Sequence, residues 1–143
     1  MLVDENKAVV TQFSERMAKG DRSAVDELTT ADFVMHNLAT GADDNREALK
    51  QGNARVLSAF SDASLIIRDL IAEGDRVVAR YTFGGMHTGK LMSISPTGKH
   101  FSVARFMVFR LESGRIAEGW NLVDHLSIFQ QLGVLPPTQD IGK

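Results

Sequence analysis

The hydrophobic pattern of this chain changes once, near Ala63, and that change constrains the fold more than any other feature. Before it, apolar residues recur at intervals of three and four, the spacing of amphipathic helices. After it, the turn signals Glu73–Asp75 and Ser113–Gly114 separate β-rich runs. These runs are Leu65–Ala72, Arg76–Phe83, His100–Leu111 and Arg115–Asp124. Helices followed by antiparallel strands predict an α+β domain with the helices on one face of a curved sheet.

The first half carries start signals for three helices, and a short helix is expected after the last strand. Aspartate is a good N-cap, so we expect the three helices to begin after Asp4, Asp21 and Asp44. Asp44 opens what resembles a capping box, and the helix it opens is expected to place Phe60 on its inner side. The last helix is expected over Leu126–Leu132.

Length and composition limit the class of protein. At 143 residues the chain fits one domain, 1–143, with a single substantial core. The net charge of -2 gives no electrostatic reason to bind nucleic acid or an anionic membrane. No apolar run approaches the roughly 20 residues that span a bilayer, and no signal peptide is recognised, so no membrane association is expected. The absence of cysteine excludes disulfides and thiolate metal sites, and it fits a cytoplasmic protein.

The 100–111 run is apolar on both faces, which bears on assembly. One face carries Phe101, Val103, Met107 and Phe109, and the other carries Ala104, Phe106 and Val108. Because an antiparallel sheet with one wet face alternates apolar with polar residues, we expect one face to meet the helices and the other a second copy of the chain.

The last strand is expected to take part in the same contact. Its second face carries the small residues Ala117, Gly119, Asn121 and Val123, which permit close packing of one sheet on another. We therefore assign this face to the partner of a homodimer. Coverage of the face by the C-terminal tail or a loop is the alternative.

The first face of the last strand holds the leading catalytic candidate. Trp120 and Asp124 are four residues apart, so on a strand both point to the same side. Desolvation raises the pKa of a carboxyl group, and an acid beside a large aromatic ring is a plausible proton-transfer residue near neutral pH. The alternative is that Asp124 only caps the last helix. The residues alone slightly favour the cap.

Two further residues are candidates for the same site. His36 follows a short apolar strand and is either a proton shuttle or a histidine that ties the strand end to nearby backbone. Arg105 lies in an otherwise apolar strand, where it needs a partner. A two-residue turn at Ser113–Gly114 would put Arg105 opposite Leu122, on the Asp124 face, where it orients a carbonyl group or forms an ion pair. A one-residue slip would move Arg105 to the other face.

The remaining polar motifs give no sign of a cofactor. His87 and His100 flank the glycine-rich connection 84–98, but no histidine pair has a recognisable metal-ligand spacing. The glycines do not form a phosphate-binding loop, and no nucleophile elbow is present. We expect no metal site.

The second half of the chain resembles the SnoaL-like polyketide cyclases, also called ester cyclases, of the NTF2-like superfamily. The resemblance covers roughly residues 83–136, with a looser match at Asp32–Phe33 and His36–Asn37. It is carried by Gly85–Gly89, Pro96–Lys99, Gly114–Glu118, Trp120, Asp124 and Gln131–Gly133.

This resemblance implies a cone-shaped α+β barrel whose curved antiparallel sheet and N-terminal helices enclose an apolar pocket. It also implies a homo-oligomer, a small apolar carbonyl substrate, and a cofactor-free intramolecular aldol condensation. The family's acid/base aspartate maps onto Asp124, with His36 assisting, and Trp120, Arg105 and His87 are expected to contact the substrate. An isomerase, a dehydratase and a non-catalytic binding or dimerisation module are the alternatives, because one fold hosts many functions.

Overall fold

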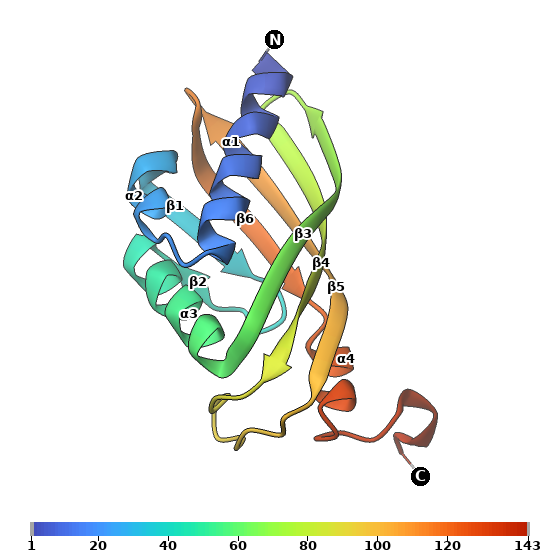
Figure 1. Cartoon of the computed structure of the whole chain (residues 1–143). Coiled ribbons are helices and arrows are strands. Elements are labelled where there is room, and N and C mark those ends of the chain that lie inside the picture. Colours follow the sequence, from blue (N-terminus) through green and yellow to red (C-terminus); the bar gives the residue numbers. More distant parts are fainter. Residues whose placement is uncertain (1, 143) are drawn as a thin grey trace.

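One curved, six-stranded sheet organises the computed structural model, which describes residues 2–142 (Figure 1). The strand order is β2-β1-β6-β5-β4-β3. The strands are β1 (Thr29–Asn37), β2 (Asp43–Asp44), β3 (Phe60–Glu73), β4 (Arg76–His87), β5 (His100–Glu112) and β6 (Arg115–Val123). The helices are α1 (Leu2–Ala18), α2 (Ser23–Leu28), α3 (Arg46–Ala59), α4 (His125–Gln131) and a short 3-10 helix, η1 (Thr138–Asp140).

The sheet is mixed and open. Neighbouring strands pair antiparallel except β1 and β6, which run parallel through pairs such as Met35 with Gly119. The edge strands β2 and β3 do not pair with each other, so the barrel is not closed. The α+β prediction and the curved sheet with N-terminal helices are confirmed, and the barrel is a partial one.

The helices lie on the concave face of the sheet, with α1 and α3 crossing it (Figure 1). Val10 and Phe13 of α1 are buried against Tyr81 and Phe109 of the sheet, and the rings of Phe13 and Phe109 meet edge to face at 6.1 Å. Burying each side chain of this size stabilises the fold by about 1.5–3 kcal/mol. Among residues 2–142, no helix has the length and apolar content needed to cross a membrane.

Four predicted helix boundaries are wrong. The first helix already includes Leu2, so Asp4 lies within its first turn. The N-cap position of α2 is held by Arg22 and not by Asp21, and no side chain caps this helix. Asn45 caps α3, because its Oδ1 accepts a hydrogen bond from the Ala48 amide at 2.9 Å while Asp44 is held in β2. Phe60 is the first residue of β3 and pairs with His87, so strand pairing overrides the helical spacing that had included it.

A β-bulge in β6 decides which side chains face the helices. Leu111 pairs with Ile116 but Arg110 pairs with Glu118, so Ala117 is an extra residue in the strand. Downstream of the bulge, Arg105 therefore pairs with Val123 and not with Leu122.

The bulge places Gly119, Asn121 and Val123 on the concave face, where Asn121 and Val123 line a cavity. The prediction that this face of the last strand meets a partner subunit is therefore wrong. Trp120 and Leu122 lie on the opposite, convex face. The faces of β5 follow the prediction, with Phe101, Val103, Met107 and Phe109 buried and Phe106 exposed.

Candidate functional site

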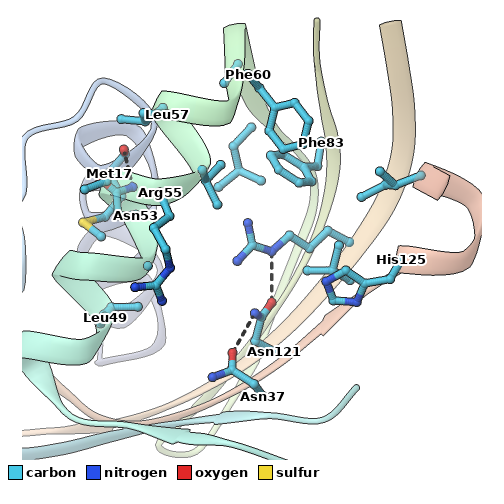
Figure 2. Close-up of a pocket in the computed structure, with 18 of the residues that line it drawn as sticks. Met17, Asn37, Leu49, Asn53, Arg55, Leu57, Phe60, Phe83, Asn121 and His125 are labelled. Atoms are coloured by element: carbon cyan, nitrogen blue, oxygen red, sulfur yellow. Dashed lines mark hydrogen bonds between the residues drawn. The ribbon is translucent and has the colours of Figure 1, made fainter. Parts of the chain in front are cut away.

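A cavity of about 840 Å³ lies between the concave face of the sheet and helices α1, α3 and α4 (Figure 2). Its walls are mainly apolar and include Phe13, Met35, Leu49, Phe60 and Phe83. This volume is within the range of pockets that enclose drug-sized molecules. Such a space, with a few polar groups inside it, is the natural place for a substrate.

Arg105 projects into this cavity from β5. Its Nε donates a hydrogen bond to Asn121 Oδ1 at 2.9 Å, and its guanidinium carbon lies 5.3 Å from the centre of the Phe83 ring. Burial lowers the pKa of Arg105, and the Tyr81 hydroxyl partly offsets that effect. Arginine nevertheless stays charged in proteins. Within residues 2–142, no carboxylate pairs with Arg105 and its Nη hydrogens have no protein acceptor.

A chain of side-chain amides connects Arg105 to a carboxylate. Asn121 Nδ2 donates to Asn37 Oδ1 at 3.2 Å, and Asn37 Nδ2 donates to Asp44 Oδ2 at 2.9 Å (Figure 2 shows the first of these two bonds). Every bond in the chain points from the cation toward the anion, so the bonds polarise one another in the same direction. The chain fixes the orientation of the Arg105 side chain.

His125 is the second titratable group in the cavity. It is the first residue of α4, and Figure 2 shows it reaching from that helix toward the strand face that carries Asn121. Burial lowers the pKa of His125, and the positive charge of Arg105 lowers it further, whereas Asp124 acts in the opposite direction. The lowered pKa keeps the imidazole neutral at pH 7, so it is able to accept a proton.

Asp124 and Trp120 do not line the cavity, although Asp124 was expected to be its acid/base and Trp120 to contact the substrate. Asp124 is exposed at the N-cap of α4, where its Oδ1 accepts a hydrogen bond from the Ser127 amide at 3.0 Å. Trp120 lies on the convex face, where the Arg76 guanidinium carbon is 4.9 Å from its ring centre. The bulge at Ala117 separates the two residues from the cavity. The acid/base role predicted for Asp124 has no support from this geometry.

His36 also lies outside the cavity. Its Nε2 is 2.6 Å from Glu118 Oε2 and its Nδ1 is 2.8 Å from Asp43 Oδ1. These hydrogen bonds, first that with Glu118 and then that with Asp43, raise the pKa of His36. Its contacts therefore describe a histidine that ties β1 to its neighbours on the convex side. The role is structural, as in the alternative given above, but the partners are side-chain carboxylates and not backbone groups.

His87 is fully buried at the end of β4, away from the cavity lining. Its Nδ1 accepts a hydrogen bond from the Thr97 amide at 3.2 Å, and its ring lies 5.8 Å from that of Phe60. Nε2 has no hydrogen-bond partner among the described residues. The contacts fasten the connection between β4 and β5 to the end of the sheet, so His87 does not join Arg105 in the cavity.

Of the predicted site residues, only Arg105 reaches the cavity. The polar lining residues that were missed include Asn37, Asp44, Asn121 and His125. A signal for His125 was present, because a capping Asp124 makes the next residue the start of a helix that packs beside the strand end. No group of three or more histidine, aspartate or glutamate residues able to hold a metal occurs within residues 2–142.

The comparisons with known proteins agree with this fold. The curated relative aklanonic acid methyl ester cyclase DauD of Streptomyces sp. (strain C5) is 28% identical over 118 residues, which cover 77% of this chain and 73% of DauD. TsrD from Streptomyces laurentii superposes with a TM-score of 0.78 and 32% identity, covering 90% of this chain and 97% of TsrD.

IdmH, a candidate polyketide cyclase from Streptomyces antibioticus, superposes with a TM-score of 0.82 and 27% identity, covering 90% of this chain and 99% of IdmH. A candidate SnoaL-like cyclase from Jannaschia sp. CCS1 shares the fold, with a TM-score of 0.84 at 20% identity and 94% coverage of both chains. Residues 7–132 match the family profile described as SnoaL-like polyketide cyclase, which is most of the chain. The chain therefore belongs to the SnoaL-like polyketide cyclase family.

Proposed function

We propose that this protein is an enzyme that closes a ring by intramolecular aldol condensation of an apolar carbonyl compound, or catalyses a closely related proton transfer. The observation that carries the proposal is that a neutral imidazole, His125, and an unpaired guanidinium, Arg105, share one large apolar cavity. A base and a hydrogen-bond donor of positive charge are the two groups that enolate chemistry requires.

The proposed reaction needs no other reagent. The His125 imidazole removes a proton from a carbon flanked by two carbonyl groups, and the electron pair moves to a carbonyl oxygen as an enolate. Arg105 donates hydrogen bonds to that oxygen and stabilises its negative charge. The enolate carbon attacks a second carbonyl group of the same molecule, forming the new C–C bond. The resulting alkoxide takes the proton back from the His125 imidazolium.

The apolar walls supply the remaining catalysis. Rings such as those of Phe60 and Phe83 would hold a folded polycyclic molecule so that its two ends meet, which is catalysis by proximity. The name of DauD states that it cyclises aklanonic acid methyl ester. By similarity, we extend the reaction type, cyclisation, to this protein.

The base in this proposal is His125 and not Asp124. The Asp124 carboxylate is bound to the Ser127 amide at 3.0 Å and lies outside the cavity, whereas His125 lines it. The two residues are adjacent in sequence, so the choice between them can be tested with a matched pair of variants, His125→Gln and Asp124→Asn.

The test measures enzyme-catalysed exchange of the α-protons of methyl 3-(2-naphthyl)-3-oxopropanoate in D2O by NMR. We expect His125→Gln to slow the catalysed exchange at least about 100-fold, the typical contribution of a general base. Asp124→Asn is expected to stay within about twofold of the unaltered protein. Full activity of His125→Gln would refute the assignment. Binding without catalysed exchange would favour the non-catalytic binding module, and product analysis separates ring closure from isomerisation or loss of water.

We also propose that the protein is a homodimer through the convex face of the sheet. Phe106 and Leu122 are each 46% exposed there, and Val78 is 37% exposed. Phe106 pairs with Leu122 across β5 and β6, and Val78 pairs with Val108, which follows Phe106 on the same face of β5. These apolar side chains therefore form a continuous patch at the centre of the sheet. A second copy of the same face would cover the patch in a two-fold arrangement.

A further inference from the structure

The strongest unexplained feature of the cavity is a cation without a counter-charge. Among residues 2–142, Arg105 makes a single hydrogen bond, to the neutral Asn121 amide, and it packs over the Phe83 ring. Arg105 is partly buried. A charge that is partly removed from water without a partner is destabilising, and such charges are normally paired with an anion. The fold thus retains a charged group whose partner is not among residues 2–142.

The charged side chains that line the cavity carry a net positive charge. Among the described residues that line it, the cationic side chains are Arg55, Lys90 and Arg105, against the single carboxylate of Asp44. Asp44 lies at the far end of the amide chain, where Asn37 already binds it. Figure 2 shows Arg55 reaching from α3 into the space between helix and sheet, and Arg55 has no hydrogen-bond or ion-pair partner among the described residues.

We propose that the cavity binds a molecule carrying a free carboxylate, which pairs with the guanidinium of Arg105 while the apolar body of the molecule packs against the aromatic walls. The inference rests on the proposed function only in taking this cavity as the substrate site. The ligand proposed here differs from the methyl ester in the name of DauD, because it is a free acid and not an ester.

The geometry of Arg105 specifies how the carboxylate approaches. The Nε hydrogen is already donated to Asn121, so a carboxylate cannot bind Nε and one Nη at the same time. The end-on approach remains, in which each carboxylate oxygen accepts one hydrogen from a different Nη. One hydrogen then remains on each Nη, so a neighbouring carbonyl oxygen of the same molecule can still be bound during the reaction.

Charge is what should distinguish the acid from neutral analogues. An ester or amide fits the same space but leaves the Arg105 charge uncompensated, whereas a carboxylate neutralises it through hydrogen bonds about twice as strong. Arg55 lies at the cavity lining on α3 and is exposed, so its contribution to attracting an anion is screened by salt, whereas that of Arg105 is screened much less.

The experiment compares 2-naphthoate with 2-naphthamide, which has nearly the same shape without the charge, and with methyl 2-naphthoate. Calorimetric titration near neutral pH is expected to give about tenfold or greater preference for the acid over both neutral probes. In Arg105→Gln the preference should fall to about twofold or less while amide affinity is retained. Arg55→Gln should weaken acid binding only at low salt. Arg80→Gln, on the exposed Asp69 ion pair, is the matched control and should change nothing.

The inference is overturned if the unaltered protein binds the amide or ester as tightly as the acid, if it fails to bind the acid below about 1 mM, or if Arg105→Gln keeps the preference. Should Arg105→Gln fail to fold, the ratio measured on the unaltered protein decides alone. Selective acid binding without proton exchange would refute the proposed function and leave this inference standing. Catalysed proton exchange without a preference for the acid would refute this inference and leave the proposed function standing.

Discussion

The ring of Trp120 packs against the imidazole of His36 on the convex face of the sheet, with centroids 5.4 Å apart and planes inclined by 35°. His36 is in turn held between Glu118 and Asp43 at 2.6 and 2.8 Å. Arg110 also reaches Glu118, with Nε 3.1 Å from Oε1. The two residues that resembled parts of an active site are thus members of an ionic and aromatic cluster on the outside of the sheet.

This cluster predicts a pH dependence of stability. Because the pKa of His36 is raised in the folded protein, the stabilisation is fully present below the ordinary value of 6.5 and is lost as pH rises through the raised pKa. We expect His36→Gln to remove this loss of stability between mildly acidic and mildly alkaline pH. Urea unfolding at several pH values measures it, with the exposed His100→Gln as control. Parallel profiles for the unaltered protein and His36→Gln would contradict the prediction.

Asp124 is predicted to matter for stability and not for chemistry. Asp124→Ala removes the hydrogen bond to the Ser127 amide and should cost about 1 kcal/mol of unfolding free energy. Asp124→Asn retains a capping oxygen and should cost much less. Thermal and urea unfolding measure both variants. If Asp124→Asn folds normally but loses catalysed proton exchange, Asp124 has a chemical role after all.

The lowered pKa of His125 predicts the acidic limb of the pH–rate profile. The rate should fall only below pH 6.5, the ordinary value for histidine, because the base must be neutral to act. In Arg105→Gln the limb should move to higher pH, since one of the causes of the lowered pKa is removed while burial remains. The profile of catalysed proton exchange tests both statements. If the acidic limb stays at the same pH in Arg105→Gln, the charge of Arg105 does not influence the pKa of the base.

Gly89 is predicted to be sterically indispensable. Its amide donates to the Ala59 carbonyl at 2.9 Å, and a Cβ at position 89 would lie 2.0 Å from the Ser58 carbonyl oxygen. We expect Gly89→Ala to cost at least about 2 kcal/mol, because backbone on both sides must move. Gly52→Ala is the control, since a Cβ there meets only Arg55 at 3.7 Å and helix propensity should stabilise it by about 0.5–1 kcal/mol. Equal unfolding midpoints would show that the loop adapts freely.

The proposed homodimer predicts a specific sensitivity of the convex face. Leu122→Asp should convert a dimer into a monomer by placing a charge in the apolar patch, with little effect on the concave side. Light scattering coupled to size-exclusion chromatography measures the mass. Leu126→Asp, a change at an exposed leucine of α4, is the control. A monomeric unaltered protein at micromolar concentration would exclude the arrangement.

The order of elements and the core face of β5 were predictable, because Phe101, Val103, Met107 and Phe109 follow the period of a strand. The site was less predictable, since it depends on the single extra residue Ala117. No distinctive residue type marks this β-bulge in the sequence, yet because of it Asn121, and not Trp120, faces the cavity. The contact of Asn37 with Asn121 depends on parallel pairing of distant strands, which local spacing does not encode.

The two residues of β2 lie in the same short strand but bind opposite sides of the sheet. Asp43 binds His36 on the convex side, and Asp44 binds Asn37 at the end of the chain that leads to Arg105. The turn 38–42 that delivers them is closed by the Asn37 amide, which donates to the Ala42 carbonyl at 2.8 Å. A change in the length of this turn would therefore not be neutral. Adding or removing one residue would turn each aspartate to the other face of the sheet, and contacts on the exterior and in the interior would be lost together.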